Sequence, residues 1–214
     1  TGNPGTGKTS IARILSKYLK AIGALRGGQR VEVTRADLVG RYVGHTAPLT
    51  NTVIQSALGG VLFIVEAYSL YRGGEDSFGL EAIDTLVKGI EDHRSDLVVI
   101  LAGYTKEMQL FLSANSGLAS RFPNQIEFPD YTGAELYKIL LSIAKSKGYR
   151  LDESCEQPLT EWFDRRQAED AATNGNGRMA RNALEKAILN QSRRLVADPD
   201  ACLELLLPGD FELE

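Results

Sequence analysis

The stretch Gly2-Asn3-Pro4-Gly5-Thr6-Gly7-Lys8-Thr9 decides the fold of this 214-residue chain. It matches the pattern G-x-x-x-x-G-K-[ST] in full, and the glycines of this pattern let backbone N–H groups turn inward around phosphate oxygens. Lys8 adds a positive charge at the β- and γ-phosphates, the Thr9 hydroxyl coordinates Mg²⁺, and the following helix directs its positive end at the same anion. The predicted nucleoside triphosphate site comprises Gly2, Asn3, Pro4, Gly5, Thr6, Gly7, Lys8, Thr9 and Ser10.

The alternative is a glycine-rich turn that matches by chance. An amphipathic helix follows the motif at once, and a second nucleotide motif occurs downstream, at residues 60–67. Both observations oppose a chance match. Because a phosphate loop follows a β-strand and the chain starts on the loop without Met, we expect a fragment whose first sheet strand lies upstream.

Composition excludes several classes of protein. Hydrophobic residues make up 43% and charged residues 24%, and the formal net charge is −4, so no global field attracts nucleic acid or an anionic membrane. No apolar run is long enough to span a bilayer, and no secretory leader opens the chain. Cys155 and Cys202 lack the spacing of a disulfide framework or a metal site. These features predict a cytoplasmic protein that neither binds nucleic acid nor inserts into a membrane.

Residues 1–130 alternate short apolar runs with amphipathic stretches, which is typical of βα units on a parallel sheet. The expected strands are Arg30–Thr34, Val61–Val65, Leu97–Ala102 and Gln125–Phe128, the second and third buried on both faces. The expected helices are Lys8–Lys20, Ala47–Leu58, Ser77–Asp92 and Thr105–Leu112. This region is therefore predicted to be an α/β P-loop NTPase domain, with a parallel sheet flanked by helices.

Residues 131–214 are predicted to form helices only, as a small lid domain. Thr132 and Glu135 form a capping box, and Gly148 ends the first helix. A second helix contains Leu159, Trp162 and Phe163, a polar loop covers Ala172–Gly177, and a third helix runs from Arg178 to Val196. Within that last helix, Arg193 and Arg194 are expected to form a solvated basic face.

A hydrophobic strand that ends in an acidic residue forms the second motif, Gly60-Val61-Leu62-Phe63-Ile64-Val65-Glu66-Ala67. P-loop enzymes place an Asp there to hold Mg²⁺, and a following Glu activates water. Glu66 is the candidate general base, and the alternative is a strand-end carboxylate that faces solvent. Val65 stands where the Asp belongs and cannot bind a metal, so we predict ATP binding with weakened turnover.

The chain resembles the CbbX/CfxQ family of AAA+ ATPases, which includes red-type rubisco activases, sporulation protein K and the type VII secretion ATPases. The resemblance covers nearly the whole chain, and Val65 departs from it, since the family has Asp there. Besides the phosphate loop, it is carried by Asp37-Leu38-Val39-Gly40-Arg41-Tyr42-Val43-Gly44-His45-Thr46-Ala47, Gly59–Tyr68, Leu101-Ala102-Gly103-Tyr104 and Ile126-Glu127-Phe128-Pro129-Asp130-Tyr131. It implies a homo-oligomeric ring, a hexamer with ATP at the subunit interfaces, that remodels a protein partner.

The resemblance also implies roles for individual residues. Tyr42, Val43 and Gly44 would be the pore loop that grips a polypeptide, with a packed turn tyrosine as the alternative for Tyr42. Arg121 would be the arginine finger that reaches a neighbour's γ-phosphate in trans; the alternative is a surface arginine at a helix end.

Two further roles concern the nucleotide. Tyr104 occupies the water-positioning place called sensor 1, and the alternative is a residue that only walls the site. Arg178 would contact the ATP phosphates as sensor 2, with Arg181 as the substitute one turn on.

Two functions stay open: a remodelling ATPase, and a nucleotide-binding regulatory or scaffold ring subunit whose hydrolysis is impaired by Val65. A GTPase is disfavoured because the chain has no N-K-x-D signature, and a small-molecule kinase is disfavoured by Glu66 and the long helical C-terminal region. The sequence does not identify the protein partner.

Overall fold

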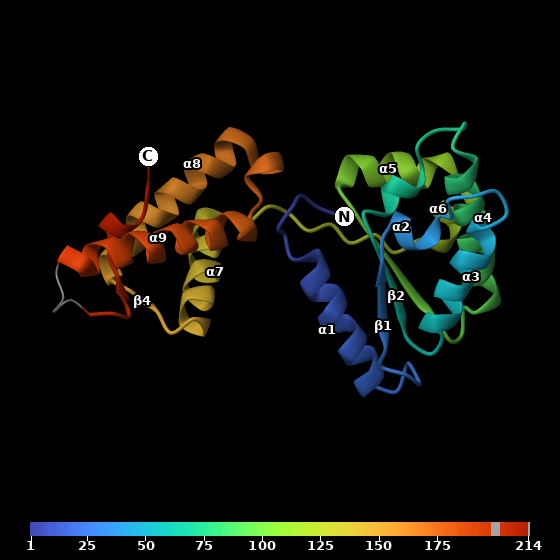
Figure 1. Cartoon of the computed structure of the whole chain (residues 1–214), viewed down its shortest axis with the longest axis horizontal. Helices are drawn as coiled ribbons and strands as arrows, with labels where there is room; N and C mark the ends of the chain where they lie inside the picture. Colours follow the sequence, from blue (N-terminus) through green and yellow to red (C-terminus); the bar gives the residue numbers. More distant parts are fainter. Residues whose placement is uncertain (198–201, 214) are drawn as a thin grey trace. The chain divides into compact units, whose positions relative to one another are not determined.

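The computed structural model describes residues 1–197 and 202–213, which fold as two compact units (Figure 1). The first unit comprises Thr1–Gly2 and Gly7–Glu127, and the second comprises Asn3–Thr6 and the chain from Phe128 onward. The predicted lid domain also covers residues 198–201 and 214, which lie outside the described part.

A three-stranded parallel sheet forms the centre of the first unit, in the order β1 (Arg30–Val33), β2 (Val61–Val65) and β3 (Val98–Ala102). Val61 to Ile64 of β2 are fully buried, which confirms a strand that is apolar on both faces. The same expectation is wrong for β3, whose residues Val98 to Leu101 are only half-buried. Within the described sheet β3 pairs with β2 alone, so it is an edge strand.

Helices cover both faces of this sheet (Figure 1). On one face, Phe63 packs with Ala12 of α1 (Lys8–Ala21). On the other, Leu62 and Ile64 join the main core with residues of α3 (Thr46–Ala57) and α4 (Ser77–Asp92). This alternation follows from the two-residue period of a strand. The unit is completed by α2 (Arg35–Leu38), η1 (Ala67–Leu70), α5 (Thr105–Ala114) and α6 (Ser116–Arg121).

The predicted strand Gln125–Phe128 is wrong, because residues 125–127 have no regular structure and Phe128 forms only an isolated bridge. The amino group of Thr1 donates to the carbonyl of Ile126 at 2.6 Å. One such bond does not make a ladder, and Ile126 stays 63% exposed.

The second unit is mainly helical, with α7 (Gly133–Ser146), α8 (Glu156–Asn174) and α9 (Gly177–Ala197). The predicted capping box is confirmed, since Thr132 Oγ1 accepts from the Glu135 amide at 3.3 Å and Glu135 accepts from the Thr132 amide at 2.9 Å. Gly148 follows the end of α7 with φ of 83°, which confirms the predicted stop. Two short 3₁₀ turns are η2 (Glu153–Cys155) and η3 (Pro208–Asp210).

Two predictions for this unit are wrong. The unit is not purely helical, because β4 (Arg150–Leu151) and β5 (Leu205–Leu206) pair in parallel. The loop predicted at Ala172–Gly177 is shorter, because α8 continues to Asn174 past a kink at Asp170. The turn itself consists of Gly175 and Asn176, both with positive φ.

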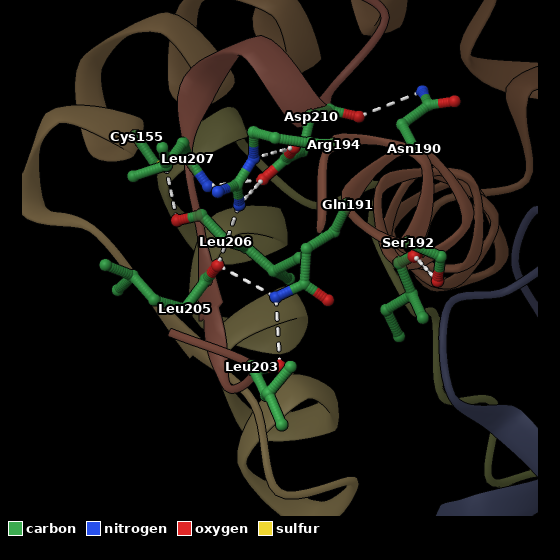
Figure 2. A network of polar contacts seen from close by, with 11 residues as sticks. Cys155, Asn190, Gln191, Ser192, Arg194, Leu203, Leu205, Leu206, Leu207 and Asp210 are labelled. Atoms are coloured by element: carbon green, nitrogen blue, oxygen red, sulfur yellow. Dashed lines mark hydrogen bonds and ion pairs between the residues drawn. The ribbon is translucent and has the colours of Figure 1, made fainter. Parts of the chain in front are cut away.

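Arg194 is not part of a solvated face, as Figure 2 shows. Its guanidinium donates to the Asp210 carboxylate at 2.9 Å and 2.8 Å, and Asp210 is only 3% exposed. The amide of Leu207 donates to the same carboxylate at 2.8 Å. Gln191 adds bonds to the carbonyls of Leu203 and Leu205. The segment after α9 is thus held against that helix by buried polar contacts, which a pattern of two adjacent arginines did not reveal.

None of the helices in the described part of the chain is long and apolar enough to cross a membrane.

Candidate functional site

The first turn of α1 has the features of an anion site. The helix begins at Lys8, directly after Gly7, whose φ of 93° lies in the left-handed region. Gly7, the N-cap residue, makes no side-chain capping hydrogen bond, and the first turn holds no acidic residue. The free N–H groups of the first helical turn and the positive end of the helix dipole are therefore directed toward the loop that precedes the helix. This arrangement fits the phosphates of a nucleotide.

Lys8 and Tyr104 lie together. The Lys8 ammonium donates to the carbonyl of Gly2 at 2.7 Å and lies 5.6 Å from the centroid of the Tyr104 ring. Tyr104 is the N-cap of α5 and is also 5.7 Å from the ring of Tyr68. The fold thus brings Lys8 of the phosphate loop close to Tyr104, the residue predicted for the sensor 1 position, although the two are distant in the sequence.

Thr9 is half-buried and Ser10 is exposed. Among the described residues there is no group of three or more His, Cys, Asp or Glu side chains that could hold a metal ion. Mg²⁺ in nucleotide sites is commonly held by one or two protein oxygens together with the substrate phosphates. Thr9 fits that mode, and Val65 contributes no ligand.

Glu66 stands between β2 and η1 with φ of 51° and ψ of 48°, the left-handed conformation. Its side chain is exposed. A residue other than glycine in this region costs about 1–2 kcal/mol, so surrounding contacts must hold it there. Burial, followed by the nearby charge of Glu66, raises the pKa of Tyr68 to about 12. Glu66 and Tyr68 therefore share one electrostatic environment.

Arg35, which the sequence did not single out, supports the turn that follows Glu66. Its guanidinium donates to the carbonyls of Ser69 and Leu70 at 3.0 Å and 3.1 Å. It also pairs with Asp76, the N-cap of α4, at 2.8 Å. The hydrogen bond from Arg35 is the main cause that lowers the pKa of Asp76, so the carboxylate stays charged. The start of α2, η1 and the start of α4 are thereby joined around one ion pair.

Val65 is the last residue of β2 and is half-buried. It lines a cavity of about 400 Å³ whose other lining residues are Thr34, Arg35, Ala36, Val39, Glu66, Ser69 and Arg72. The position therefore packs against the cluster of Ala12, Phe63 and Ala102 and also borders the cavity beside Glu66.

The predicted pore-loop residues are exposed. Tyr42 is 69% and Val43 is 87% exposed, and Gly44 has φ of 80°. The Tyr42 ring contacts His45 edge-on at 5.5 Å. This exposure does not fit the alternative of a packed turn tyrosine.

Arg121 ends α6, where its guanidinium donates to the carbonyl of Gly117 at 3.3 Å and pairs with Glu91 at 3.5 Å. Within one chain it therefore does what its alternative describes, since it closes a helix end. A role in trans requires that it leave Glu91.

The centre of the phosphate loop, Asn3–Thr6, folds as part of the second unit. There Asn3 donates to the Asp130 carboxylate at 3.1 Å and 2.9 Å, and the Tyr131 hydroxyl donates to the carbonyl of Thr6 at 3.0 Å. Asp130, Tyr131 and Asn176 were not predicted as site residues. Asn176 lies in an N-G-N-G run that is typical of a solvated loop, so only its buried contacts identify it.

Arg178 is exposed in the first turn of α9, and its backbone N–H donates to the carbonyl of Gly175 at 2.8 Å. Arg181, also exposed, follows on the same helix. No side-chain hydrogen bond or ion pair occurs for either guanidinium within the described residues.

Two family models match the chain. One, described as the ATPase family associated with various cellular activities (AAA), covers residues 1–130, and one described as AAA lid domain covers residues 132–214.

Curated relatives support the same assignment. Stage V sporulation protein K of Bacillus subtilis (strain 168) is 47% identical over 196 residues, which is 91% of this chain and 61% of that protein. Protein CbbX of Cereibacter sphaeroides is 46% identical over 91% of this chain and 63% of its own length. The chloroplastic ribulose bisphosphate carboxylase/oxygenase activase of Cyanidioschyzon merolae (strain NIES-3377 / 10D) is 44% identical over 93% of this chain and 68% of its own. The chain thus spans roughly two thirds of the length of these relatives.

Solved structures of the FIGL-1 AAA domain share the fold. The domain superposes with a TM-score of 0.69 at 18% identity, covering 98% of this chain and 66% of that one. The same domain in complex with ADP gives a TM-score of 0.64 at 20% identity, over 98% and 67%. At this level of identity the likeness shows the fold, an AAA domain with its helical lid.

Proposed function

Because the chain belongs to the AAA ATPase family, among its CbbX- and CfxQ-like members, we propose that it binds ATP with Mg²⁺ and, in a ring oligomer, couples hydrolysis to the remodelling of a protein partner. The observation that carries the proposal is the uncapped start of α1 behind Gly7, with the Lys8 ammonium beside it. Backbone N–H groups, the helix dipole and one ammonium group together select a polyphosphate.

In this proposal some residues bind the nucleotide and its metal, and others activate the attacking water. Residues Gly2 to Ser10 bind the phosphates, and the Thr9 hydroxyl would hold the metal, which when bound neutralises charge on the phosphate oxygens. Glu66 accepts a proton from the attacking water, and its exposed, left-handed position at the end of β2 suits that role. Tyr104 lies beside Lys8 and would orient the same water through its hydroxyl.

Three further roles depend on a neighbour or a partner. Arg121 of one subunit would reach the γ-phosphate held by the next, which makes assembly a requirement for fast turnover. Arg178 would contact the phosphates from α9. The exposed side chains of Tyr42 and Val43, next to Gly44, would grip the polypeptide partner. We propose a hexamer as the ring.

We also propose a cytoplasmic location without nucleic acid or membrane partners. Cys155 and Cys202 are both free thiols, as in proteins of a reducing compartment.

A direct test is calorimetric titration of the full-length protein with ATP and Mg²⁺, comparing Lys8→Ala with Lys17→Ala. Both lysines belong to α1, and Lys17 is exposed. We expect loss of binding for Lys8→Ala alone. If the parent protein bound no ATP, or if both variants bound equally well, the proposal would be wrong.

A nucleotide-binding regulatory subunit is the second candidate, and Val65 favours it. The two candidates differ in phosphate release at saturating ATP. A regulatory subunit binds ATP but shows no release that depends on Glu66.

A further inference from the structure

Asn176 has an unusual position for a polar residue in a turn. It is completely buried, and its φ of 46° lies in the left-handed region. Gly175 before it also has positive φ, so two consecutive residues of this kind join α8 to α9. A buried amide in a costly backbone conformation needs compensating contacts.

The Asn176 side chain uses its full hydrogen-bonding capacity. Its Nδ2 donates to the carbonyl of Pro4 at 3.2 Å and to Asp130 Oδ1 at 2.8 Å. Its Oδ1 accepts from the amide of Tyr131 at 2.9 Å and from Gln167 Nε2 at 2.8 Å. Two donors and two acceptors are all that a carboxamide offers. Aspartate could keep the acceptor half, but it could not donate.

The contacts of Asn176 belong to a clamp around the centre of the phosphate loop, which we define as Asp130, Tyr131, Asn176 and Gly177. The Asp130 carboxylate holds the Asn3 side chain, and Asn176 holds the carbonyl of Pro4. The amide of Gly177 donates to the carbonyl of Gly5 at 3.2 Å, and the Tyr131 hydroxyl holds the carbonyl of Thr6. Three consecutive carbonyls of the loop are therefore fixed by the same clamp.

When a backbone carbonyl is held in place, the orientation of the N–H group of the next residue is also determined. In a planar trans peptide the C=O and the N–H of the next residue point in opposite directions. With the carbonyls of Pro4, Gly5 and Thr6 bound to the clamp, the N–H groups of Gly5, Thr6 and Gly7 point away from it. These are the N–H groups that a phosphate loop directs at its anion.

The fit leaves no room for a side chain at Gly5. A Cβ at Gly5 would lie 1.9 Å from the carbonyl oxygen of Gly175, and its φ is 74°. The clamp therefore requires glycine at this position for space as well as for conformation.

We propose that Asn176 is a positioning residue for phosphate binding, which orients the N–H groups of the phosphate loop by holding the carbonyl of Pro4 and by bonding to Asp130 and Tyr131 of the same clamp. This inference rests on the proposed function, since it specifies how the same nucleotide is held. The turn that contains Asn176 would thus support phosphate binding independently of any contact between Arg178 and phosphate.

The test compares Asn176→Asp with Asn174→Asp in the full-length protein. The same substitution is made two residues apart, at the end of α8 and in the turn that follows it, and Asn174 bonds to the carbonyl of Arg166. Affinities for ATP and for inorganic tripolyphosphate are measured by calorimetry, and the fold is checked by circular dichroism. Tripolyphosphate reports on the phosphate site without the base.

At position 176 the new carboxylate would face the Pro4 carbonyl and the Asp130 carboxylate, two acceptors. We expect at least about tenfold weaker binding of both probes, because two hydrogen bonds are lost, one of them to a charged group. Asn174→Asp is expected to stay within about twofold. In the double variant Asn176→Asp/Asp130→Asn a donor again faces an acceptor, so part of the affinity should return.

A milder variant covers the case in which Asn176→Asp does not fold. Tyr131→Phe removes one hydroxyl bond to the Thr6 carbonyl and is expected to weaken binding about threefold. Equal affinities for the parent protein, Asn176→Asp and Tyr131→Phe would overturn the inference while leaving ATP binding established. If the parent protein bound neither probe, the proposed function would fail, and this inference with it.

Discussion

Restoring the acidic residue at the end of β2 is the most informative single change. Val65 pairs with Ala102 and borders the cavity of about 400 Å³ beside Glu66, so an aspartate there can reach open space. The substitution removes about half of the burial of a valine side chain, which costs about 1 kcal/mol of stability. Val65→Asp is therefore expected to fold.

The expected gain in hydrolysis is larger than that cost. A well-held metal contributes several kcal/mol of charge stabilisation in phosphoryl transfer. If the carboxylate recovers about 2–4 kcal/mol of this, the turnover rate rises roughly 30- to 1,000-fold. Affinity for ATP should change much less, because Lys8 and the N–H groups of the phosphate loop are untouched.

The assay is phosphate release at saturating ATP, with Mg²⁺ titrated for each variant. Val65→Asn is the matched control, because it has the shape of aspartate without its charge. We expect the increase, and a lower Mg²⁺ requirement, only for Val65→Asp. Equal rates for Val65→Asp, Val65→Asn and the parent protein, with ATP bound in all three, would refute the reasoning about the metal.

Three further predictions concern the base, the subunit contact and the helical unit. Glu66→Gly should abolish phosphate release. It should leave the free energy of unfolding, measured by chemical denaturation, unchanged within about 1 kcal/mol, because relief of the left-handed strain offsets the greater entropy of the unfolded chain. A large loss of stability would contradict this. Arg121→Ala should lower the rate of ATP hydrolysis about 1,000-fold at protein concentrations that form rings. Arg94→Ala, which removes the other ion-pair partner of Glu91, should leave the rate unchanged. Equal rates for the two variants would exclude a role of Arg121 in trans. Arg194→Ala should lower the melting temperature by about 4–8 °C, because it leaves a buried carboxylate short of its partner at a cost of about 2 kcal/mol, whereas the adjacent Arg193→Ala should shift it little.

Much of the α/β unit could be predicted from local sequence patterns, because burial of a strand and the conformation of a glycine-rich loop depend mainly on residues close together in the sequence. A run of apolar residues such as Val61–Val65 is favoured where both faces of a strand are covered, and the structure buries Val61 to Ile64 completely. The phosphate loop needs glycines at fixed positions, so it too is visible in the sequence. The strand predicted at Gln125–Phe128 failed because its pairing depends on a neighbour, which pattern alone does not supply.

The clamp and the C-terminal network could not be predicted, because their partners are distant in the chain. Asn176 bonds to the carbonyl of Pro4, 172 residues away, and a backbone carbonyl carries no signature of its own in a sequence. Asp210 is a buried carboxylate only because Arg194 reaches it. Polar residues in loops and on helix faces are read as solvated unless the tertiary structure shows otherwise.

The structure bears on the choice between a weak enzyme and a purely regulatory subunit. Glu66 is kept in a conformation that costs free energy, and Arg35 stabilises the turn behind it through two carbonyls and a half-buried ion pair. In the proposed function this carboxylate acts on the water, whereas Val65 would affect the metal. If both roles hold, the protein is an ATPase whose turnover is limited by how well Mg²⁺ is held, and the Val65→Asp and Glu66→Gly variants test the two roles separately.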